Sequence, residues 1–522
     1  MKSAGCQCDI EQPRPSPAPT PISSVTGMSI FGQLFLRSIA LGIAFSAGAV
    51  VEAYRLTSLQ GLEIWRHLQV GSWILGKMAL PRFGLFSQSG NLTWRDVNWG
   101  YDLLTAAGYR ILDLRVLPVQ LMFFRFSIAV VAFLLAGGRR HFWRGTFFSL
   151  AAQYLLGKMG PEPAFCSVIL FGIELLVLGG IHRRQGARMV YALPLLFLMW
   201  ANLDEGVVYG IAAYALFFSA LWIERRTRWA YVSNPSSLPF QKLAIAGIAS
   251  AVASLLNPYG YYPYVLFFDN QRDVLNVNLS GHGAMGFHSP RDYAFLLLIM
   301  AAFLILGRRH SFSLVALGLL VGSAALAFRS EQCMWVAVMA SIAVMGEKTW
   351  SKAPNPVSLK NHVWPWNWFA SSMALAGVLM MCVFFLLRVP DSHQVLMGRV
   401  ARQFPQAACD YIRQHNLPKP LFNSQRWGSF LMWYLPEYPV SIDGRRGLYS
   451  EQDENNYAKA MKADIPYQRY APMRQAQTLL LEKSSLMGEA MRDVTGFQLV
   501  YEDDLAVVLL HQGKEAKPAI SQ

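Results

Sequence analysis

Long apolar runs alternate with short clusters of Arg and Lys along most of this chain, and this alternation restricts its fold more than any other feature. A helix needs about 20 mostly apolar residues to cross a bilayer, and fewer when neighbouring helices shield its ends. We count eleven such runs, at residues 29–51, 115–137, 145–158, 164–181, 189–203, 205–223, 240–256, 293–307, 311–327, 333–346 and 369–388. The sequence therefore predicts a mainly α fold, a polytopic helical membrane bundle of about 11 spans.

The low content of charged residues is typical of a protein whose surface faces lipid. Only 15% of the residues are charged, whereas soluble domains carry about 25%. The net charge of +14 could indicate nucleic acid, but the basic residues lie between the apolar runs. No basic patch interleaved with stacking aromatic residues occurs, so we expect the lipid bilayer as a partner and no nucleic acid.

Basic clusters follow every even-numbered run and predict the orientation. They are Arg139, Arg140 and Arg144; Arg183, Arg184 and Arg188; Arg225, Arg226 and Arg228; Arg308 and Arg309; and Lys348, Lys352 and Lys360. Loops rich in Lys and Arg stay in the cytoplasm. Residues 1–28, a Pro- and Ser-rich tail predicted to be disordered, then also lie there. The long loop 52–114 and the segment from 389 onward lie outside, and we expect a multi-pass protein of a cell inner membrane.

Residues 389–522 have the pattern of a small extracytoplasmic α/β domain, because helical and strand patterns alternate. The expected elements are a helix over Gly398 to His415, a strand over Pro420 to Asn423, an amphipathic helix over Trp427 to Leu435, a strand over Pro439 to Asp443, and a hairpin of Phe497 to Tyr501 with Leu505 to Leu510.

The loop 52–114 carries the most informative polar pattern. Glu63, Arg66 and His67 are spaced i, i+3 and i+4, which places a carboxylate, a guanidinium and an imidazole on one helical face. A carboxylate held by a neighbouring cation at a membrane surface can serve as a general base or as a metal ligand. The alternative is an interfacial amphipathic helix with solvated charges, anchored by Trp65 and Trp73.

Other polar groups carry weaker signals. Asp204 and Glu205 are adjacent acids between the fifth and sixth runs, where they are either functional or part of a tight turn. Arg329 is suited to bind a phosphate, or to snorkel to the interface. The loop 257–292 gives a weak signal of a metal site through four residues, His282, His288, Arg291 and Asp292.

Several of these segments resemble a family of bacterial multi-pass membrane proteins related to C-type glycosyltransferases. The first loop fits the family pattern at Glu63, Trp65, His67, Gly71, Ile74, Pro81, Arg82, Phe86, Ser87, Trp94 and Trp99. Later matches are Trp200 and Asn202, Asn257 to Gly260, and Arg329. The tail resembles the family at Phe422, Asn423, Trp427, Gly428, Phe430, Leu431, Trp433, Ile442 to Arg445, Tyr449, and Val500 to Asp503.

The resemblance implies an enzyme that takes a sugar from a polyprenyl-phosphate carrier at the outer membrane face. Residues 29–388 would form the C-type transmembrane domain, with Glu63 as its central carboxylate. The supporting acids would be Asp96, Asp204 and Glu205, and the substrate contacts Arg66, His67 and Arg329. The acceptor, a glycan, lipid or protein, is undetermined. The cofactor is also undetermined, with a divalent cation as one option.

The sequence departs from the family at four positions. Glu63 replaces an Asp, Gly84 and Asn98 replace acids, and Asp204 replaces a His. Two acidic positions of the first loop are therefore lost, and the remaining acids there are Asp96 and Asp102. These departures favour an alternative, a catalytically inactive scaffold or glycan-binding protein of the same fold. A transporter is disfavoured, because no inverted repeat and few charges occur within the runs.

Overall fold

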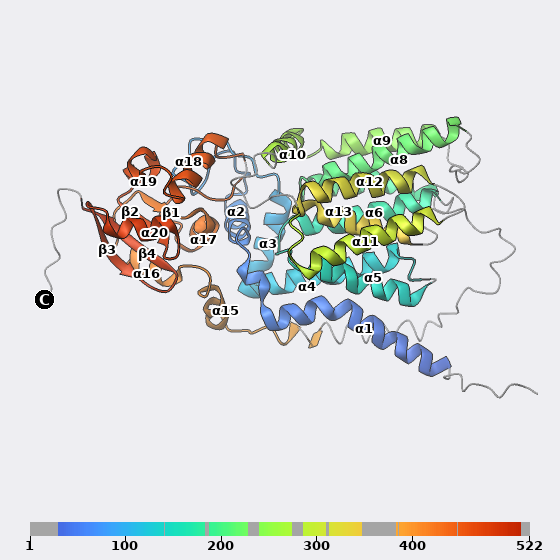
Figure 1. Cartoon of the computed structure of the whole chain (residues 1–522), viewed down its shortest axis with the longest axis horizontal. Helices are drawn as coiled ribbons and strands as arrows, with labels where there is room; N and C mark the ends of the chain where they lie inside the picture. Colours follow the sequence, from blue (N-terminus) through green and yellow to red (C-terminus); the bar gives the residue numbers. More distant parts are fainter. Residues whose placement is uncertain are drawn as a thin grey trace, which may run out of the picture.

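The computed structural model describes residues 30–139, 141–182, 187–227, 240–273, 285–308, 313–346, 383–384, 386–445 and 447–512. A long helical bundle occupies one end of the molecule and a mixed α/β tail the other (Figure 1). Between them lie α2 (Ile64–Lys77), α3 (Trp99–Leu112) and α17 (Gln425–Tyr434). The chain is therefore mainly helical with a small C-terminal sheet, as the sequence predicts.

Apolar helices form the bundle where the sequence places them. They are α1 (Ile30–Arg55), α4 (Val116–Leu135), α5 (Phe142–Leu155), α6 (Ala164–His182), α7 (Leu193–Ala201), α8 (Val207–Thr227), α9 (Phe240–Ser254), α11 (Pro290–Gly307), α12 (Leu314–Arg329) and α13 (Met334–Met345). Short 3-10 turns lie beside the helices, at Thr57–Gln60, Asp113–Arg115, Ala187–Ala192, Glu331–Cys333, Tyr467–Arg469 and Met491–Asp493. The predicted run 369–388 falls largely outside the described residues.

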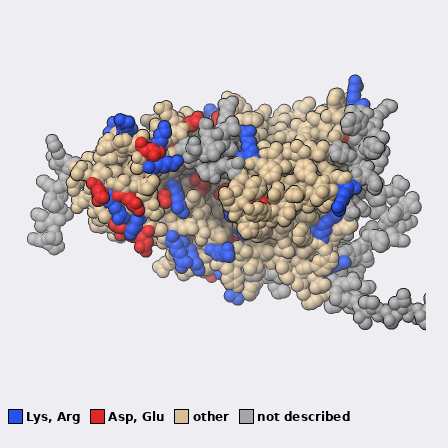
Figure 2. All heavy atoms as spheres, in the orientation of Figure 1, with Lys and Arg blue, Asp and Glu red and all other residues tan. Residues whose placement is uncertain are grey.

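Five of the described helical segments are long and apolar enough to cross a membrane. They are Phe35–Arg55, Trp99–Leu135, Ala164–His182, Val207–Arg226 and Pro290–Gly307, and shorter apolar helices accompany them. In Figure 2 the visible surface of the bundle is mostly uncharged, whereas acidic and basic side chains crowd the tail. The chain is a membrane protein, and its full number of spans stays a prediction.

The first loop is itself helical. It forms α2 (Ile64–Lys77) and α3 (Trp99–Leu112), while α10 (Tyr262–Asp273) belongs to a later loop. Helices α2 and α3 cross closely at Gly71, where a Cβ atom would lie 2.1 Å from the backbone oxygen of Asp102. A glycine is needed there because any side chain would force the two helices apart.

The tail contains a four-stranded sheet flanked by short helices. Its helices are α15 (His393–Val400), α16 (Gln406–Gln414), α17 (Gln425–Tyr434), α18 (Glu451–Met461), α19 (Ala471–Gln475) and α20 (Leu486–Ala490). Its strands are β1 (Leu421–Asn423), β2 (Thr478–Glu482), β3 (Phe497–Glu502) and β4 (Ala506–His511). The strand order is β1-β2-β4-β3, with β1 parallel to β2 and the other pairs antiparallel. The predicted hairpin is confirmed as β3 and β4.

Two predictions for the tail are wrong. The helix expected over 398–415 is two helices, because Pro405 precedes α16 and has no backbone N–H to continue a helix. The segment 439–443 is not a strand of the sheet, since Val440 instead forms an isolated bridge with Ser87 of the first loop. Strand β2, which pairs with both β1 and β4 inside the sheet, was not predicted.

An aromatic cluster joins the first loop to the tail. Trp65 of α2 is fully buried, with its ring centroid 5.6 Å from Phe404, 5.5 Å from Phe430 and 4.7 Å from Trp433. Aromatic pairs at such distances stabilise beyond the area that they bury, by about 0.5–1.5 kcal/mol each. The cluster therefore fixes the start of α2, and with it Glu63, against the C-terminal domain.

Candidate active site between the first loop and the C-terminal domain

Glu63 lies at the N-terminus of α2, directly before the Trp65 anchor. Its carboxylate oxygen Oε2 accepts hydrogen bonds from the Arg66 Nε–H and from the Ser429 hydroxyl, both at 3.2 Å. The glycine at position 444 packs against the same carboxylate. The side chain nevertheless stays 35% exposed, so the carboxylate is held from two sides and open on another.

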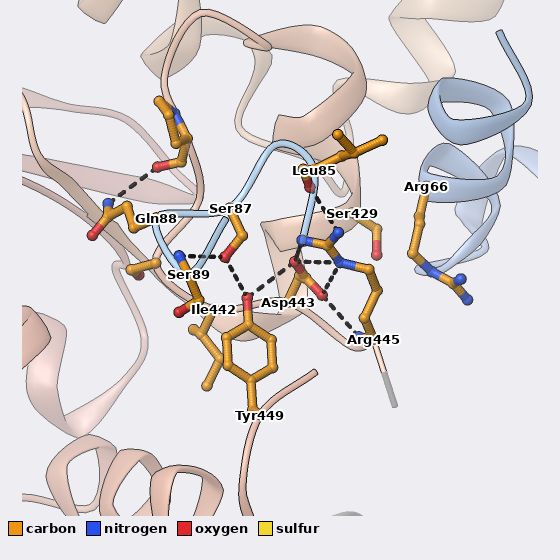
Figure 3. Close-up of polar contacts among 12 residues, drawn as sticks. Arg66, Leu85, Ser87, Gln88, Ser89, Ser429, Ile442, Asp443, Arg445 and Tyr449 are labelled. Carbon is orange, nitrogen blue, oxygen red and sulfur yellow. Dashed lines mark hydrogen bonds and ion pairs between the residues drawn. The ribbon is translucent and has the colours of Figure 1, made fainter. Parts of the chain in front are cut away.

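Arg66 is the cation of this group. Its Nη2–H group lies 3.3 Å from His67 Nε2, while its Nε–H donates to Glu63. Burial alone would lower the pKa of Arg66, but the charges of Glu63, Asp102, Asp96 and Asp443 raise it above its ordinary value. Figure 3 shows Arg66 on α2 across from Ser429 and the Asp443–Arg445 pair of the tail. The guanidinium is therefore permanently charged at the junction.

His67 points into the protein rather than into solvent. Its side chain is 1% exposed, and its Nδ1 lies 2.5 Å from Asp102 Oδ1 on α3. Burial and the neighbouring Arg66 charge lower the pKa of His67 to about 3, so the imidazole is neutral. It then donates from Nδ1 to Asp102 and accepts at Nε2 from Arg66. The alternative of an interfacial helix with solvated charges is wrong for this residue.

Asp96 is a buried acid behind this group. One of its oxygens accepts from the Asn98 backbone N–H at 3.3 Å. Burial and the nearby Asp102 carboxylate raise the pKa of Asp96 well above its ordinary value, which favours its neutral form. Asp102, on α3, accepts from His67 Nδ1.

Because burial favours the neutral carboxyl of Asp96, the uncharged variant Asp96→Asn should destabilise the protein less than Asp102→Ala does. Asp102→Ala is the contrasting variant, since it leaves the buried His67 N–H without its acceptor and should cost about 1–3 kcal/mol. Thermal unfolding of both proteins in one detergent measures the difference. Equal destabilisation by the two variants would show that Asp96 is charged in the folded protein.

The turn between α7 and α8 holds the second predicted group. The Ser167 hydroxyl donates to Asp204 and accepts from Trp200 Nε1 at 2.7 Å, and the Gly206 backbone N–H also donates to Asp204, at 3.1 Å. Asn202 of this turn accepts from the Trp99 indole at the start of α3, at 3.2 Å. Asp204 is thus buried in the turn that supports α3, and Glu205 follows it, partly exposed.

The remaining predicted residues lie in other loops. Arg329 is exposed at the end of α12. Arg291 pairs with Glu331 and lies 3.5 Å from Asp292, which caps the start of α11. His282 lies outside the described residues. Within the described part of the chain, no group of three or more His, Cys, Asp or Glu residues is placed to hold a metal ion.

A buried ion pair of the tail, formed by Asp443 and Arg445, contacts the first loop. The Arg445 guanidinium donates from Nη2 to Asp443 Oδ2 at 2.8 Å and from Nη1 to the Leu85 carbonyl at 2.7 Å. It also lies 4.9 Å from the ring centre of Trp94. The Tyr449 hydroxyl donates to Asp443 at 3.1 Å (Figure 3). The backbone of residues 443–445 is therefore fixed next to Glu63.

Sequence reasoning missed two members of the site. Ser429 lies 366 positions from its partner Glu63, and a single serine in an amphipathic helix gives no signal of such a contact. Gly444 was recognised only as part of the Asp-Gly-Arg match to the family. A pairing of that motif with the first loop could have been suspected, because both match the same family.

No family model and no curated protein matches this sequence. Among solved structures, the chain is similar to the Archaeoglobus fulgidus oligosaccharyltransferase in the apo form, with a TM-score of 0.53 and 10% identity over 87% of this chain and 70% of that one. Its complex, described as archaeal oligosaccharyltransferase AglB from Archaeoglobus fulgidus with an inhibitory peptide and a dolichol-phosphate, gives a TM-score of 0.53 and 11% identity over the same shares, 87% and 70%.

ArnT from Cupriavidus metallidurans bound to undecaprenyl phosphate gives a TM-score of 0.47 and 12% identity over 94% of this chain and 100% of that one. At such low identity these likenesses concern the fold. The chain shares the fold of the archaeal oligosaccharyltransferase, and the resemblance to C-type glycosyltransferases that its sequence indicates is confirmed at that level.

Proposed function

We propose that this protein is a membrane glycosyltransferase that uses a polyprenyl-phosphate-linked sugar at the extracytoplasmic face. The fold supports the general class. The observation that carries the proposal is the Glu63 carboxylate, which is held by Arg66 and Ser429 yet remains partly open at the junction of the first loop and the tail. A fixed carboxylate with an exposed edge is what a general base requires.

In the proposed reaction, the oxygen of an acceptor hydroxyl bonds to the anomeric carbon of the sugar. The bond between that carbon and the carrier phosphate breaks, and its electron pair leaves with the polyprenyl phosphate. The acceptor proton passes to the Glu63 carboxylate. Arg66, which stays charged, is placed to stabilise negative charge near this point, because charge-assisted hydrogen bonds to phosphate are strong.

The other predicted residues take supporting roles in this proposal. His67 is buried and positions Arg66 through its Nε2 acceptor. Asp96 keeps a neutral carboxyl behind Asp102, and Asp204 holds the turn that supports α3. Glu205 and Arg329 are the more accessible members, and the exposed guanidinium of Arg329 is suited to a carrier phosphate.

The domain layout belongs to the same proposal. It comprises a cytoplasmic tail (1–28), a bundle of about 11 spans (29–388) and an extracytoplasmic domain (389–522). Support comes from basic residues in the last turns of helices, such as Arg225 and Arg226 in α8. Figure 2 shows Lys and Arg side chains at the end of the bundle away from the tail, as expected for a cytoplasmic end.

We expect a reporter that is active only outside the cytoplasm to be active when fused after residue 395. The same reporter should be inactive when fused after Arg228, the last residue of the basic cluster with Arg225 and Arg226. Enzyme activity of the two fusions in intact cells measures this, with immunoblots to confirm equal expression. The reverse pattern at either position would contradict the orientation.

A catalytically inactive scaffold or glycan-binding protein is the alternative, and one observation favours it. At position 84, where the family pattern has an acid, a Cβ atom would lie 2.8 Å from the Ser89 carbonyl oxygen and 2.9 Å from a Leu448 methyl carbon. The structure therefore has no space for an acidic side chain there. Failure of the purified protein to transfer sugar from any of a broad panel of polyprenyl-phosphate donors would favour this alternative.

A further inference from the structure

The first helix of the tail, α15, lies beside the tail-side ends of two apolar helices. It contacts the turn after α1, Thr57–Gln60, and the turn before α4, Asp113–Arg115. Both α1 and α4 belong to segments that are long and apolar enough to cross a membrane. Helix α15 is therefore at the level where the bilayer meets water on the tail's side.

Helix α15 has one buried and one exposed face. Its buried side chains are Leu396, Met397 and Val400, and they belong to the same core as the bundle. Val395 is 51% exposed, and Arg399, one turn later, is exposed on the same face. An apolar residue and an arginine that share an exposed face are typical of a helix that lies along a membrane surface.

Further apolar side chains are exposed beside α15. Leu387, in the segment before this helix, is 75% exposed, and Tyr54, in the last turn of α1, is 63% exposed. Tyrosine is enriched at the interface between membrane and water, where its ring lies at the level of the lipid headgroups. These side chains therefore continue the lipid-facing surface of the bundle as far as α15.

Four exposed arginines belong to the same segments, and we name them the arginine patch. They are Arg55, Arg388, Arg399 and Arg402. None of them forms an ion pair with a carboxylate that the structure describes. The nearby acids are already occupied, since Asp391 pairs with Arg115, Asp113 pairs with His393, and Glu52 is buried. The patch thus carries an uncompensated positive charge.

The location of this charge is unusual for a membrane protein. Loops rich in Lys and Arg normally lie in the cytoplasm, and in the proposed orientation the arginine patch lies on the other side. Figure 2 shows Lys and Arg side chains both at the end of the bundle away from the tail and where the tail meets the bundle. Because the second group does not help to orient the chain, it indicates a ligand of opposite charge.

We propose that the arginine patch binds the phosphate headgroups of anionic phospholipids in the leaflet on the tail's side. Guanidinium groups pair bidentately with phosphate oxygens, while Val395, Leu387 and Tyr54 lie among the upper parts of the acyl chains. Bound lipid then holds α15, and with it the start of the tail, on the bilayer. This lipid site is independent of the proposed reaction, because it shares no residue with the site around Glu63.

The first test measures lipid binding to the full-length protein in detergent by native mass spectrometry. The wild type should bind phosphatidylglycerol more tightly than phosphatidylcholine with the same chains, which has no net charge. Each arginine near an anionic surface contributes about fivefold, so Arg399→Gln/Arg402→Gln should bind phosphatidylglycerol about 25-fold more weakly. Its affinity for phosphatidylcholine should not change, and thermal unfolding confirms that the variant is folded.

The matched control is Arg469→Gln/Arg474→Gln. These two residues are also exposed arginines of the tail, but they lie in and beside α19, at the end of the molecule away from the bundle (Figure 1). The control removes the same net charge and should bind phosphatidylglycerol like the wild type. An equal loss of affinity in both double variants would show a nonspecific effect of net charge and would overturn the proposal.

Hydrogen exchange in nanodiscs tests the location of the lipid without any substitution. The wild-type protein is reconstituted in phosphatidylcholine alone or with added phosphatidylglycerol, and exchange is followed by mass spectrometry. Backbone amides of residues 393–402 should exchange at least about tenfold more slowly with phosphatidylglycerol, because bound lipid opposes local opening of α15. Amides of α19 should exchange equally fast in both nanodiscs.

Polyprenyl phosphate is the other lipid that could bring a phosphate to the arginine patch, and its affinity is measured in the same way. If Arg399→Gln/Arg402→Gln bound polyprenyl phosphate more weakly and phosphatidylglycerol as tightly as the wild type, the patch would belong to the donor site and the proposal would be wrong. Equal affinity of the wild type for the two phospholipids, or equal exchange in the two nanodiscs, would also overturn it. Absence of sugar transfer by the wild type would leave it intact.

Discussion

Glu63→Gln is expected to lower the rate of sugar transfer at least about a hundredfold, since a general base typically contributes about 10²–10⁴-fold. The glutamine keeps the size of the side chain and can still accept from Arg66 or Ser429 through its carbonyl oxygen. It lacks the negative charge that draws the acceptor proton. The measurement is transfer from a polyprenyl-phosphate sugar donor in nanodiscs, with the expression of each variant checked.

Two further variants sharpen this test. Glu63→Asp restores the residue of the family pattern and should retain part of the activity, because it keeps the charge and moves it by one methylene. Glu489→Gln removes a carboxylate from an exposed position of the tail and should transfer at the wild-type rate. Full activity of Glu63→Gln would show that this residue is not the general base. It would then be a structural link between α2 and the tail.

The helices of the bundle were predictable because their signal is local. Ala164–His182 and Pro290–Gly307 are apolar runs of the length that a membrane requires, and no distant residue is needed to recognise them. The β3–β4 hairpin was predictable for the same reason, since two apolar stretches flank a short acidic turn. β2 was missed because its pairing with β1 joins residues far apart in the sequence, such as Leu421 and Thr478.

The candidate site was predictable only within one helix turn. The spacing of Glu63, Arg66 and His67 placed them together, and the structure does link them through Arg66. The same spacing could not show that His67 faces inward, because its direction depends on Asp102 of another helix. The segment 439–443 was misread for a related reason. Its bridging partner, Ser87, belongs to the first loop and not to the sheet.

Arg445→Ala is expected to destabilise the protein strongly. Removing one partner of a buried ion pair leaves an uncompensated charge, here Asp443, and typically costs about 3–5 kcal/mol. The variant also loses the hydrogen bond to the Leu85 carbonyl and the contact with Trp94, which hold the first loop. We therefore expect a lower melting temperature and a lower amount of protein in the membrane, measured by thermal unfolding in detergent and by immunoblot.

The matched control for this variant is Arg426→Ala. Arg426 also pairs with a carboxylate of the tail, that of Glu482, but its side chain is 51% exposed, and such pairs contribute about 0–1 kcal/mol. Its melting temperature should therefore stay close to that of the wild type. Arg445→Lys should be destabilised too, because an ammonium group cannot match the several directed contacts of the guanidinium. If Arg445→Ala abolished transfer at an unchanged melting temperature, Arg445 would act in the reaction itself, and its architectural role would be wrong.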